Sequence, residues 1–225
     1  MKVSLARAVR WVVLAAGAIA YPFVAHYSTT PAAISTMPWL GVATALTPAL
    51  AILLWLTWQS SKKPALLLLW AAIGLVLWQF WGALERNFSW AYFIQHAGTN
   101  LMLAAMFGAT LAQGRQPLCT RFAEAVHRGL TPEMERYSRQ VTVAWTLFFV
   151  TISLVSAGLF LLAPLEIWSV FANFLNFPLV LLMFAVEYRV RLYTMPTLEK
   201  HSILDGMLAF WKTRPDRPGA TPPLG

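Results

Sequence analysis

The sequence is poor in charged residues. Only 12% of its 225 residues are Asp, Glu, Lys or Arg, whereas an average soluble domain is about a quarter charged. A soluble protein of this size needs a polar surface, and a chain that is 58% hydrophobic lacks the residues to make one. The shortage of charge therefore excludes an ordinary soluble domain and indicates that lipid covers much of the protein surface.

Cysteine is nearly absent, because Cys119 is the single one. No intrachain disulfide and no cysteine-based metal site can form from it. A nucleophile-and-base pair of Cys119 with His127 is disfavoured, since eight residues separate them by about 12 Å along a helix. The sequence also lacks a Gly-rich phosphate loop, a pair of neighbouring carboxylates and an HExxH-type zinc motif. We therefore expect neither a metal nor a cofactor.

What is abundant is apolar runs long enough to cross a membrane, for which about 20 residues suffice. Six such runs predict an all-α, polytopic integral membrane protein with six transmembrane helices. They cover about residues 9–27, 39–58, 64–84, 89–111, 141–162 and 167–188. The first is interpreted as a retained helix rather than a signal peptide, because Tyr21, Pro22 and Phe23 stand where a small-residue cleavage site is expected.

The distribution of positive charge predicts the orientation of these helices. If the N-terminus is cytoplasmic, the three external loops (28–38, 85–88 and 163–166) contain one basic residue, Arg86. The other 16 of the 17 lysines and arginines then lie on the cytoplasmic side. Both termini are therefore expected in the cytoplasm. Because the basic residues lie in short segments between apolar runs, the net charge of +8 indicates topology and not nucleic-acid binding.

A cytoplasmic segment, residues 112–140, is the longest polar stretch between the apolar runs. Within it, apolar residues from Leu118 to Val126 recur at helical spacing, which predicts a short amphipathic helix on the inner leaflet. Thr131 and Pro132 are typical of a helix start, so the fifth helix is expected to begin near Pro132, about two turns before it enters lipid. Residues 191–225 form a predicted cytoplasmic tail. Its stretch 203–211 is weakly amphipathic, and its proline-rich end is expected to be disordered.

The cytoplasmic segment is also basic, and this predicts a surface that binds lipid headgroups or an acidic partner protein. The residues assigned to this surface are Arg115, Arg121, His127, Arg128, Arg136 and Arg139.

Polar side chains within the apolar runs form the candidate site, because such groups are costly in lipid. They are Gln79, Gln95, His96, Thr99, Asn100, Asn173 and Asn176. His96 lies about seven residues from the outer end of its helix, or roughly 10 Å deep, and Asn173 is at a similar depth. Two interpretations stay open: ordinary hydrogen bonds between helices, or a ligand-binding or catalytic site. If chemistry occurs, His96 is the best candidate, since only it titrates near neutral pH.

Residues 96–149 carry a set of short motifs that point to a family. They are Gly98-x-x-Leu101, Phe107-Gly108-x-Thr110-Leu111, Gly114-Arg115-x-Pro117-Leu118, Thr120-Arg121, His127-x-x-Leu130-x-Pro132-Glu133 and Tyr137-x-Arg139-x-Val141-Thr142-x-Ala144-Trp145-x-x-Phe148-Phe149. This stretch resembles small bacterial inner-membrane proteins encoded in gene clusters for aryl polyene and xanthomonadin-type pigments. Relatives are sometimes labelled ketosynthases. This chain lacks the length, cysteine and histidines that such an enzyme needs.

The resemblance implies a multi-pass protein of the bacterial inner membrane with a role in making or moving a polyene lipid pigment. The first expectation is an accessory or scaffold protein. It would gather soluble biosynthetic enzymes, or an acidic acyl carrier protein, on its basic cytoplasmic surface. Two alternatives stay open: a membrane enzyme that uses the polar cluster on a lipid-linked acyl substrate, and a component of a lipid transporter or flippase.

Overall fold

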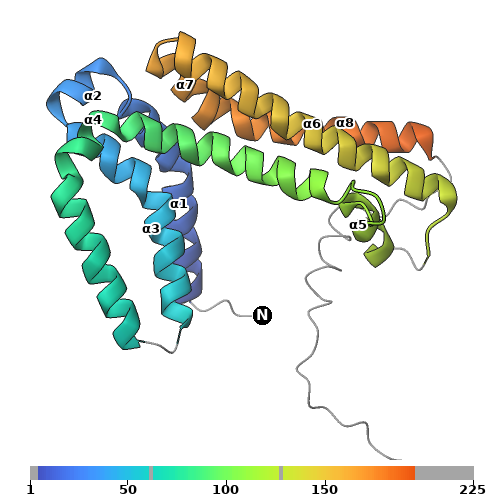
Figure 1. Ribbon diagram of the computed structural model, residues 1–225, viewed down its shortest axis with the longest axis horizontal. Helices are drawn as coiled ribbons and strands as arrows, with labels where there is room; N and C mark the ends of the chain where they lie inside the picture. The colour runs from blue at the N-terminus through green and yellow to red at the C-terminus, as the bar shows by residue number, and fades with distance from the viewer. Residues whose placement is uncertain (1–4, 61–62, 127–128, 196–225) are drawn as a thin grey trace, which may run out of the picture. The chain divides into compact units, whose positions relative to one another are not determined.

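The computed structural model describes residues 5–60, 63–126 and 129–195, and all the regular structure in these ranges is helical. The tail beyond residue 195, with its expected amphipathic stretch, lies outside the described residues. The helices are α1 (Leu5–Tyr27), α2 (Pro31–Thr36), α3 (Pro38–Gln59), α4 (Lys63–Ala109), α5 (Leu118–Val126), α6 (Pro132–Leu162), α7 (Leu165–Val170), the π-helical turn η1 (Phe171–Leu175) and α8 (Asn176–Thr194) (Figure 1).

Four stretches of helix in the described part of the chain are long and apolar enough to cross a membrane. They are Pro38–Gln59, Leu66–Ala109, Pro132–Leu162 and Leu165–Thr194, and Trp11–Tyr27 is a shorter apolar helix. The protein is therefore a membrane protein with several spanning helices. Helix α6 begins at the expected residue, Pro132, and α5 covers the expected amphipathic stretch. The short helix α2 was not expected, although Thr30 and Pro31 supply its N-cap and first residue.

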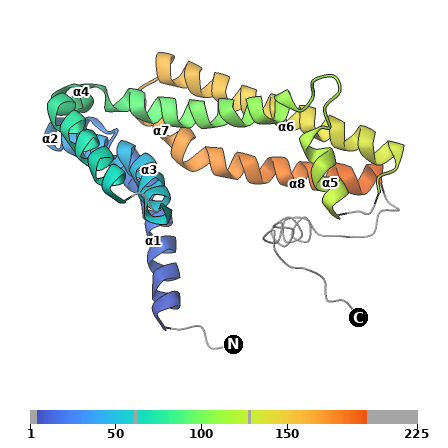
Figure 2. The same ribbon diagram turned by 60° about the horizontal axis from the view of Figure 1, so that its bottom comes forward.

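Helix α4 is two helices joined by a bend. Asn87 has non-helical backbone angles (φ −127°, ψ 16°), and its side-chain amide donates to the Ala83 carbonyl. Figures 1 and 2 show the first segment of α4 turning away from the second. The bend falls within residues 85–88, which the sequence predicts to be a loop between two spans. The expected break therefore occurs without a loop.

The chain divides into two compact units. The first comprises the residues up to Asn100 together with Ile152–Leu181. Its core is formed by Ala25, Val42, Ala45, Phe88, Tyr92 and Trp168. Gly41 allows α3 to approach the Phe88 ring closely, since a Cβ at Gly41 would lie 2.6 Å from Phe88 Cδ2.

A π-helical turn interrupts the last apolar helix of this unit. The chain runs from α7 through η1 into α8 without a break, and its backbone widens over Phe171–Leu175. Such π-bulges alter the direction in which side chains point and are frequent at functional sites. The turn contains Asn173 and is followed directly by Asn176, so it positions two of the polar residues that the sequence singles out.

The second unit comprises Leu101–Thr151 and the residues from Leu182 onward. Polar contacts attach α5 to α6 in this unit: the Thr120 and Ser138 hydroxyls lie 2.8 Å apart, and the Cys119 N–H donates to Thr142 Oγ1 at 3.2 Å. The rings of Trp145 and Phe184 pack α6 against α8, with their centroids 4.6 Å apart.

Candidate functional site

A cavity of about 230 Å³ lies within the first unit. Its walls come from α1, the second segment of α4, α7, η1 and α8. The lining residues are Tyr21, Tyr92, Gln95, His96, Thr99, Asn100, Trp168, Ala172, Asn173 and Asn176. Seven of these ten side chains are Tyr, Asn, Gln or His, so the cavity is polar although it lies among apolar helices.

The structure brings six of the seven predicted intramembrane polar residues to this cavity. The exception is Gln79, which is exposed and does not line it. Gln79 lies apart from this cavity because of the bend in α4. The bend turns the segment that carries Gln79 away from the segment that carries His96. Depth along a helix does not predict which way each helix is directed.

The His96 ring is held by a serine that the sequence analysis did not single out. His96 Nδ1 lies 3.0 Å from Ser156 Oγ, and the same oxygen accepts the indole N–H of Trp168 at 3.0 Å. The indole can only donate, and the structure gives the Ser156 hydroxyl no other acceptor among the described residues. Ser156 therefore donates its proton to His96 Nδ1, which assigns the neutral ring with its proton on Nε2.

Two buried side-chain atoms at this cavity make no hydrogen bond within the described part of the chain. They are His96 Nε2 and Asn176 Oδ1. The Asn176 side chain lies close enough to His96 to act on it as a hydrogen-bonding group, although the two side chains do not meet the distance and angle of a hydrogen bond. Buried polar atoms are rarely left without a partner. This pair therefore offers one donor and one acceptor to whatever occupies the cavity.

The other amides are satisfied by the protein. Gln95 donates to the Ala45 carbonyl of α3, and Asn100 Nδ2 donates to the His96 carbonyl at 2.9 Å. Asn173 Nδ2 donates to the backbone and the hydroxyl oxygen of Ser169, both at 3.0 Å. Of these bonds, that of Gln95 joins two helices, as the structural interpretation expects. The bonds of Asn100 and Asn173 each run to a residue four positions earlier in the same helical stretch.

A second histidine belongs to the same polar network. His26, near the C-terminal end of α1, has its Nδ1 3.3 Å from Ser169 Oγ, the oxygen that Asn173 also contacts. Sequence reasoning missed His26 and Ser156. Serines are common in membrane helices, and only the packing of α1, α4, α6 and α7 shows which of them meet a histidine. The full burial of Ser156 and Ser169 is a property of the tertiary structure.

Four arginines of the predicted basic surface are exposed, and two of them also bind backbone carbonyls. Arg115 Nη1 donates to the Ala109 carbonyl at 3.4 Å, and Arg139 Nη2 donates to the Leu111 carbonyl at 3.1 Å. Both guanidinium groups therefore cap the C-terminal end of α4, as basic side chains commonly do. Arg121 and Arg136 are exposed. The remaining two residues assigned to the surface, His127 and Arg128, lie outside the described residues.

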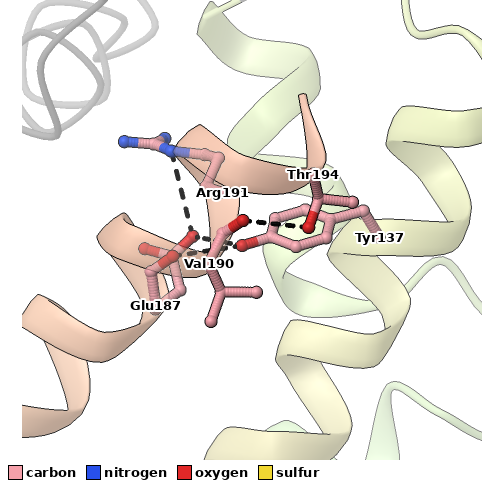
Figure 3. Close-up of polar contacts among 5 residues, drawn as sticks. All are labelled: Tyr137, Glu187, Val190, Arg191 and Thr194. Carbon is pink, nitrogen blue, oxygen red and sulfur yellow. Dashed lines mark hydrogen bonds and ion pairs between the residues drawn. The ribbon is translucent and has the colours of Figure 1, made fainter. Parts of the chain in front are cut away.

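At the end of α8 that carries basic residues, a polar cluster joins α6 to α8 (Figure 3). The Tyr137 hydroxyl donates to the Glu187 carbonyl at 3.2 Å and to Glu187 Oε1 at 3.4 Å. Arg191 Nε lies 4.0 Å from the same Oε1.

Cys119 of α5 is half-buried, and burial, with a smaller contribution from the negative charge of Glu187, raises the pKa of its thiol. A reactive, nucleophilic cysteine has a lowered thiol pKa, so the raised pKa of Cys119 argues against a role as a nucleophile.

Comparison of the chain with protein-family models, with curated proteins and with solved structures gives no match. In the described part of the chain, no three His, Cys, Asp or Glu side chains are grouped so that they could hold a metal ion. The cavity and the charged surface are therefore the features of this chain that bear on its function.

Proposed function

We propose that the protein binds the polar end of a hydrophobic molecule in its intramembrane cavity. The observation that carries this proposal is the pair of buried atoms without partners, His96 Nε2 and Asn176 Oδ1. A purely structural cluster would satisfy them, because an unmet hydrogen bond in a buried site costs about 1–3 kcal/mol. A ligand group that bonds to both atoms removes that cost.

The proposal includes a topology of six spans with both termini in the cytoplasm. Leu66–Ala109 has 44 residues, which is enough for two crossings of about 20 residues each, and its bend at Asn87 separates them. With α1, α3, α6 and the continuous helix from Leu165 to Thr194, this makes six. The distribution of basic residues supports the orientation.

We further propose that the membrane is the bacterial inner membrane and that the bound molecule belongs to the biosynthesis of an aryl polyene or xanthomonadin-like lipid pigment. The support for this step is the resemblance over residues 96–149. Within that role, the cavity favours a protein that holds a lipid-linked intermediate, either for a chemical step or for transport. His96 is the group that would move a proton in a chemical step.

Docking of an acyl carrier protein or another acidic soluble partner remains a second candidate function. It is favoured by Arg121 and Arg136, which are exposed on the segment that we place in the cytoplasm. The test is binding of purified acyl carrier protein to the detergent-solubilised chain. Arg121→Glu with Arg136→Glu is expected to abolish binding at moderate salt, whereas unchanged binding would remove this candidate.

The test of the main proposal is deletion of the gene in the source organism, followed by complementation and mass spectrometry of pigment and precursors. We expect the deletion strain to accumulate a discrete precursor, and we expect His96→Phe to behave like the deletion. Gln79→Leu is the matched control, because Gln79 is a predicted polar residue outside the cavity. Full pigment in the His96→Phe strain would exclude a role for the cavity, and full pigment in the deletion strain would exclude the pigment pathway.

A further inference from the structure

The hydrogen-bonding groups that face the cavity define the kind of ligand that fits it. Because the Ser156 hydroxyl donates a hydrogen bond to Nδ1, His96 presents Nε2–H as a donor. Asn176 presents Oδ1 as an acceptor. Both atoms are buried, and the two side chains are close enough to interact. A single hydroxyl group satisfies both, because its oxygen accepts one hydrogen bond while its proton is donated in another.

The lining also restricts the charge of the ligand. The ten lining residues include no Asp, Glu, Lys or Arg, and their titratable members are Tyr21, Tyr92 and His96. A phosphate, carboxylate or ammonium group placed here would be buried without an opposite charge, which is strongly unfavourable. The ligand group inside the cavity is therefore neutral.

The size and exposure of the cavity indicate where the rest of the ligand lies. Its volume of about 230 Å³ is below the 300–1,000 Å³ or so of sites that enclose whole drug-sized molecules. It has room for a small head group but not for a long chain as well. Thr99 lines the cavity and is also exposed, and an exposed side chain on a membrane-spanning helix faces lipid. An apolar tail can therefore remain in the bilayer while the head group is bound.

We propose that the cavity binds the neutral hydroxyl head of an amphiphile, an alcohol or a phenol with a long apolar tail, that enters from the bilayer. The ligand oxygen accepts from His96 Nε2, and its proton is donated to Asn176 Oδ1. This inference rests on the proposed function and names the ligand class of that same site.

The experiment uses the full-length chain, labelled with ¹⁵N-histidine and reconstituted in lipid nanodiscs. The probes share a 12-carbon tail: 4-dodecylphenol, dodecanol, dodecylbenzene, dodecyl phosphate and dodecyltrimethylammonium. The readout is the ¹⁵N signal of the His96 ring, assigned by its loss in His96→Gln. We expect dodecylphenol or dodecanol to shift this signal. The probe that gives the larger shift shows whether the cavity prefers a phenol or an alcohol. We expect no shift with dodecylbenzene or either charged probe.

Variants of single residues distinguish the loss of a hydrogen bond to the probe from a loss of the fold. Asn176→Leu removes the acceptor and is expected to weaken binding of the hydroxyl probe about tenfold. His96→Gln keeps an N–H donor and is expected to retain more affinity than His96→Phe, as measured by displacement of a radiolabelled hydroxyl probe. Gln79→Leu, outside the cavity, should bind like the unaltered chain. Equal affinity of Asn176→Leu and the unaltered chain would overturn the assignment of the acceptor.

The possible failures are distinguishable. Tighter binding of a charged probe, or binding of dodecylbenzene equal to that of dodecylphenol, would overturn the hydroxyl assignment while leaving a ligand-binding cavity in place. A His96 signal that no probe shifts would overturn both this inference and the proposed function.

Discussion

The Tyr137 hydroxyl donates hydrogen bonds to both the backbone carbonyl and the carboxylate of Glu187, a residue 50 positions away in the sequence. Tyr137 is buried at 9% exposure, and the Glu187 side chain is 13% exposed. The contact therefore joins α6 to α8 where water is largely excluded. It ties together two helices of the second unit that are remote in the chain.

Removing this hydroxyl is expected to loosen the second unit. Tyr137→Phe should lower the free energy of unfolding by about 1.5–3 kcal/mol, the range for a hydrogen bond to a charged group. The measurement is the thermal midpoint in detergent. Tyr27→Phe is the control, because Tyr27 is 48% exposed. Equal midpoints for the two variants would mean that the Tyr137–Glu187 contact adds no stability.

Gly41 is expected to tolerate no side chain. Gly41→Ala places a Cβ within 2.6 Å of Phe88 Cδ2, and such overpacking should cost about 1–3 kcal/mol. Gly74→Ala is the matched control, since it is also a helical glycine but has open space around its Cα. That change should be neutral or should stabilise by up to about 1 kcal/mol. Thermal unfolding of both variants checks the difference, and a Gly41→Ala midpoint as high as that of Gly74→Ala would contradict the close approach of α3 to Phe88.

Ser156 is expected to be costly to replace because it serves two partners. Ser156→Ala removes the oxygen that accepts from Trp168 Nε1 and the proton donated to His96 Nδ1. Leaving the buried indole N–H unpaired should destabilise the first unit by about 1–3 kcal/mol. Ring ¹⁵N shifts of His96 should also show a mixture of the two neutral tautomers. A single, unchanged tautomer in the variant would show that Ser156 does not determine the proton position.

The Cys119 thiol is expected to react slowly near neutral pH. Burial raises its pKa, so the fraction present as reactive thiolate at pH 7 is smaller than for a free cysteine. The rate of maleimide labelling should therefore keep rising with pH beyond the range in which a free thiol has reached its plateau. The reference is Cys119→Ser combined with Ser35→Cys, which places a thiol on the exposed surface of α2. Equal rates at pH 7 would contradict the burial of Cys119.

The same cysteine-free background tests the proposed topology. Ser35→Cys should react with a membrane-impermeant maleimide in intact spheroplasts, because we place α2 outside the inner membrane. Gln113→Cys should react only after the spheroplasts are lysed. Both positions are exposed in the structure, so differences in burial do not confuse the result. If Gln113→Cys reacts in intact spheroplasts and Ser35→Cys reacts only after lysis, the orientation is the reverse of the proposed one. Labelling of both positions in intact spheroplasts would contradict the alternation of spans.

Much of the local structure could be predicted from the sequence because it depends on neighbouring residues. Thr131 and Pro132 lie at the start of α6, and the apolar periodicity after Leu118 coincides with α5. The short helix α2 was missed, although Thr30 and Pro31 carry its start signal. The loop expected at residues 85–88 is instead a bend at Asn87, since one residue outside helical geometry is enough to redirect the chain.

The candidate site was predictable only in part. Polar residues in apolar runs stand out by composition alone, so Gln95, His96 and Asn173 could be named in advance. Gln79 stands out equally, yet it lies outside the cavity because the bend in α4 turns it away. Ser156 was not predictable, because a serine in a membrane helix carries no signal until packing places it against a histidine.

By itself, the sequence determined that the chain belongs in a membrane, since its apolar runs have no other favourable surroundings. It also determined which residues are costly to bury there. Only the tertiary structure decided which of these polar groups meet. The direction of each helix depends on bends such as Asn87, on close contacts such as Gly41 with Phe88, and on the π-helical turn before Asn176. The contact of Gly41 with Phe88 depends on packing between segments far apart in the chain, and helical periodicity within one segment contains no information about such packing.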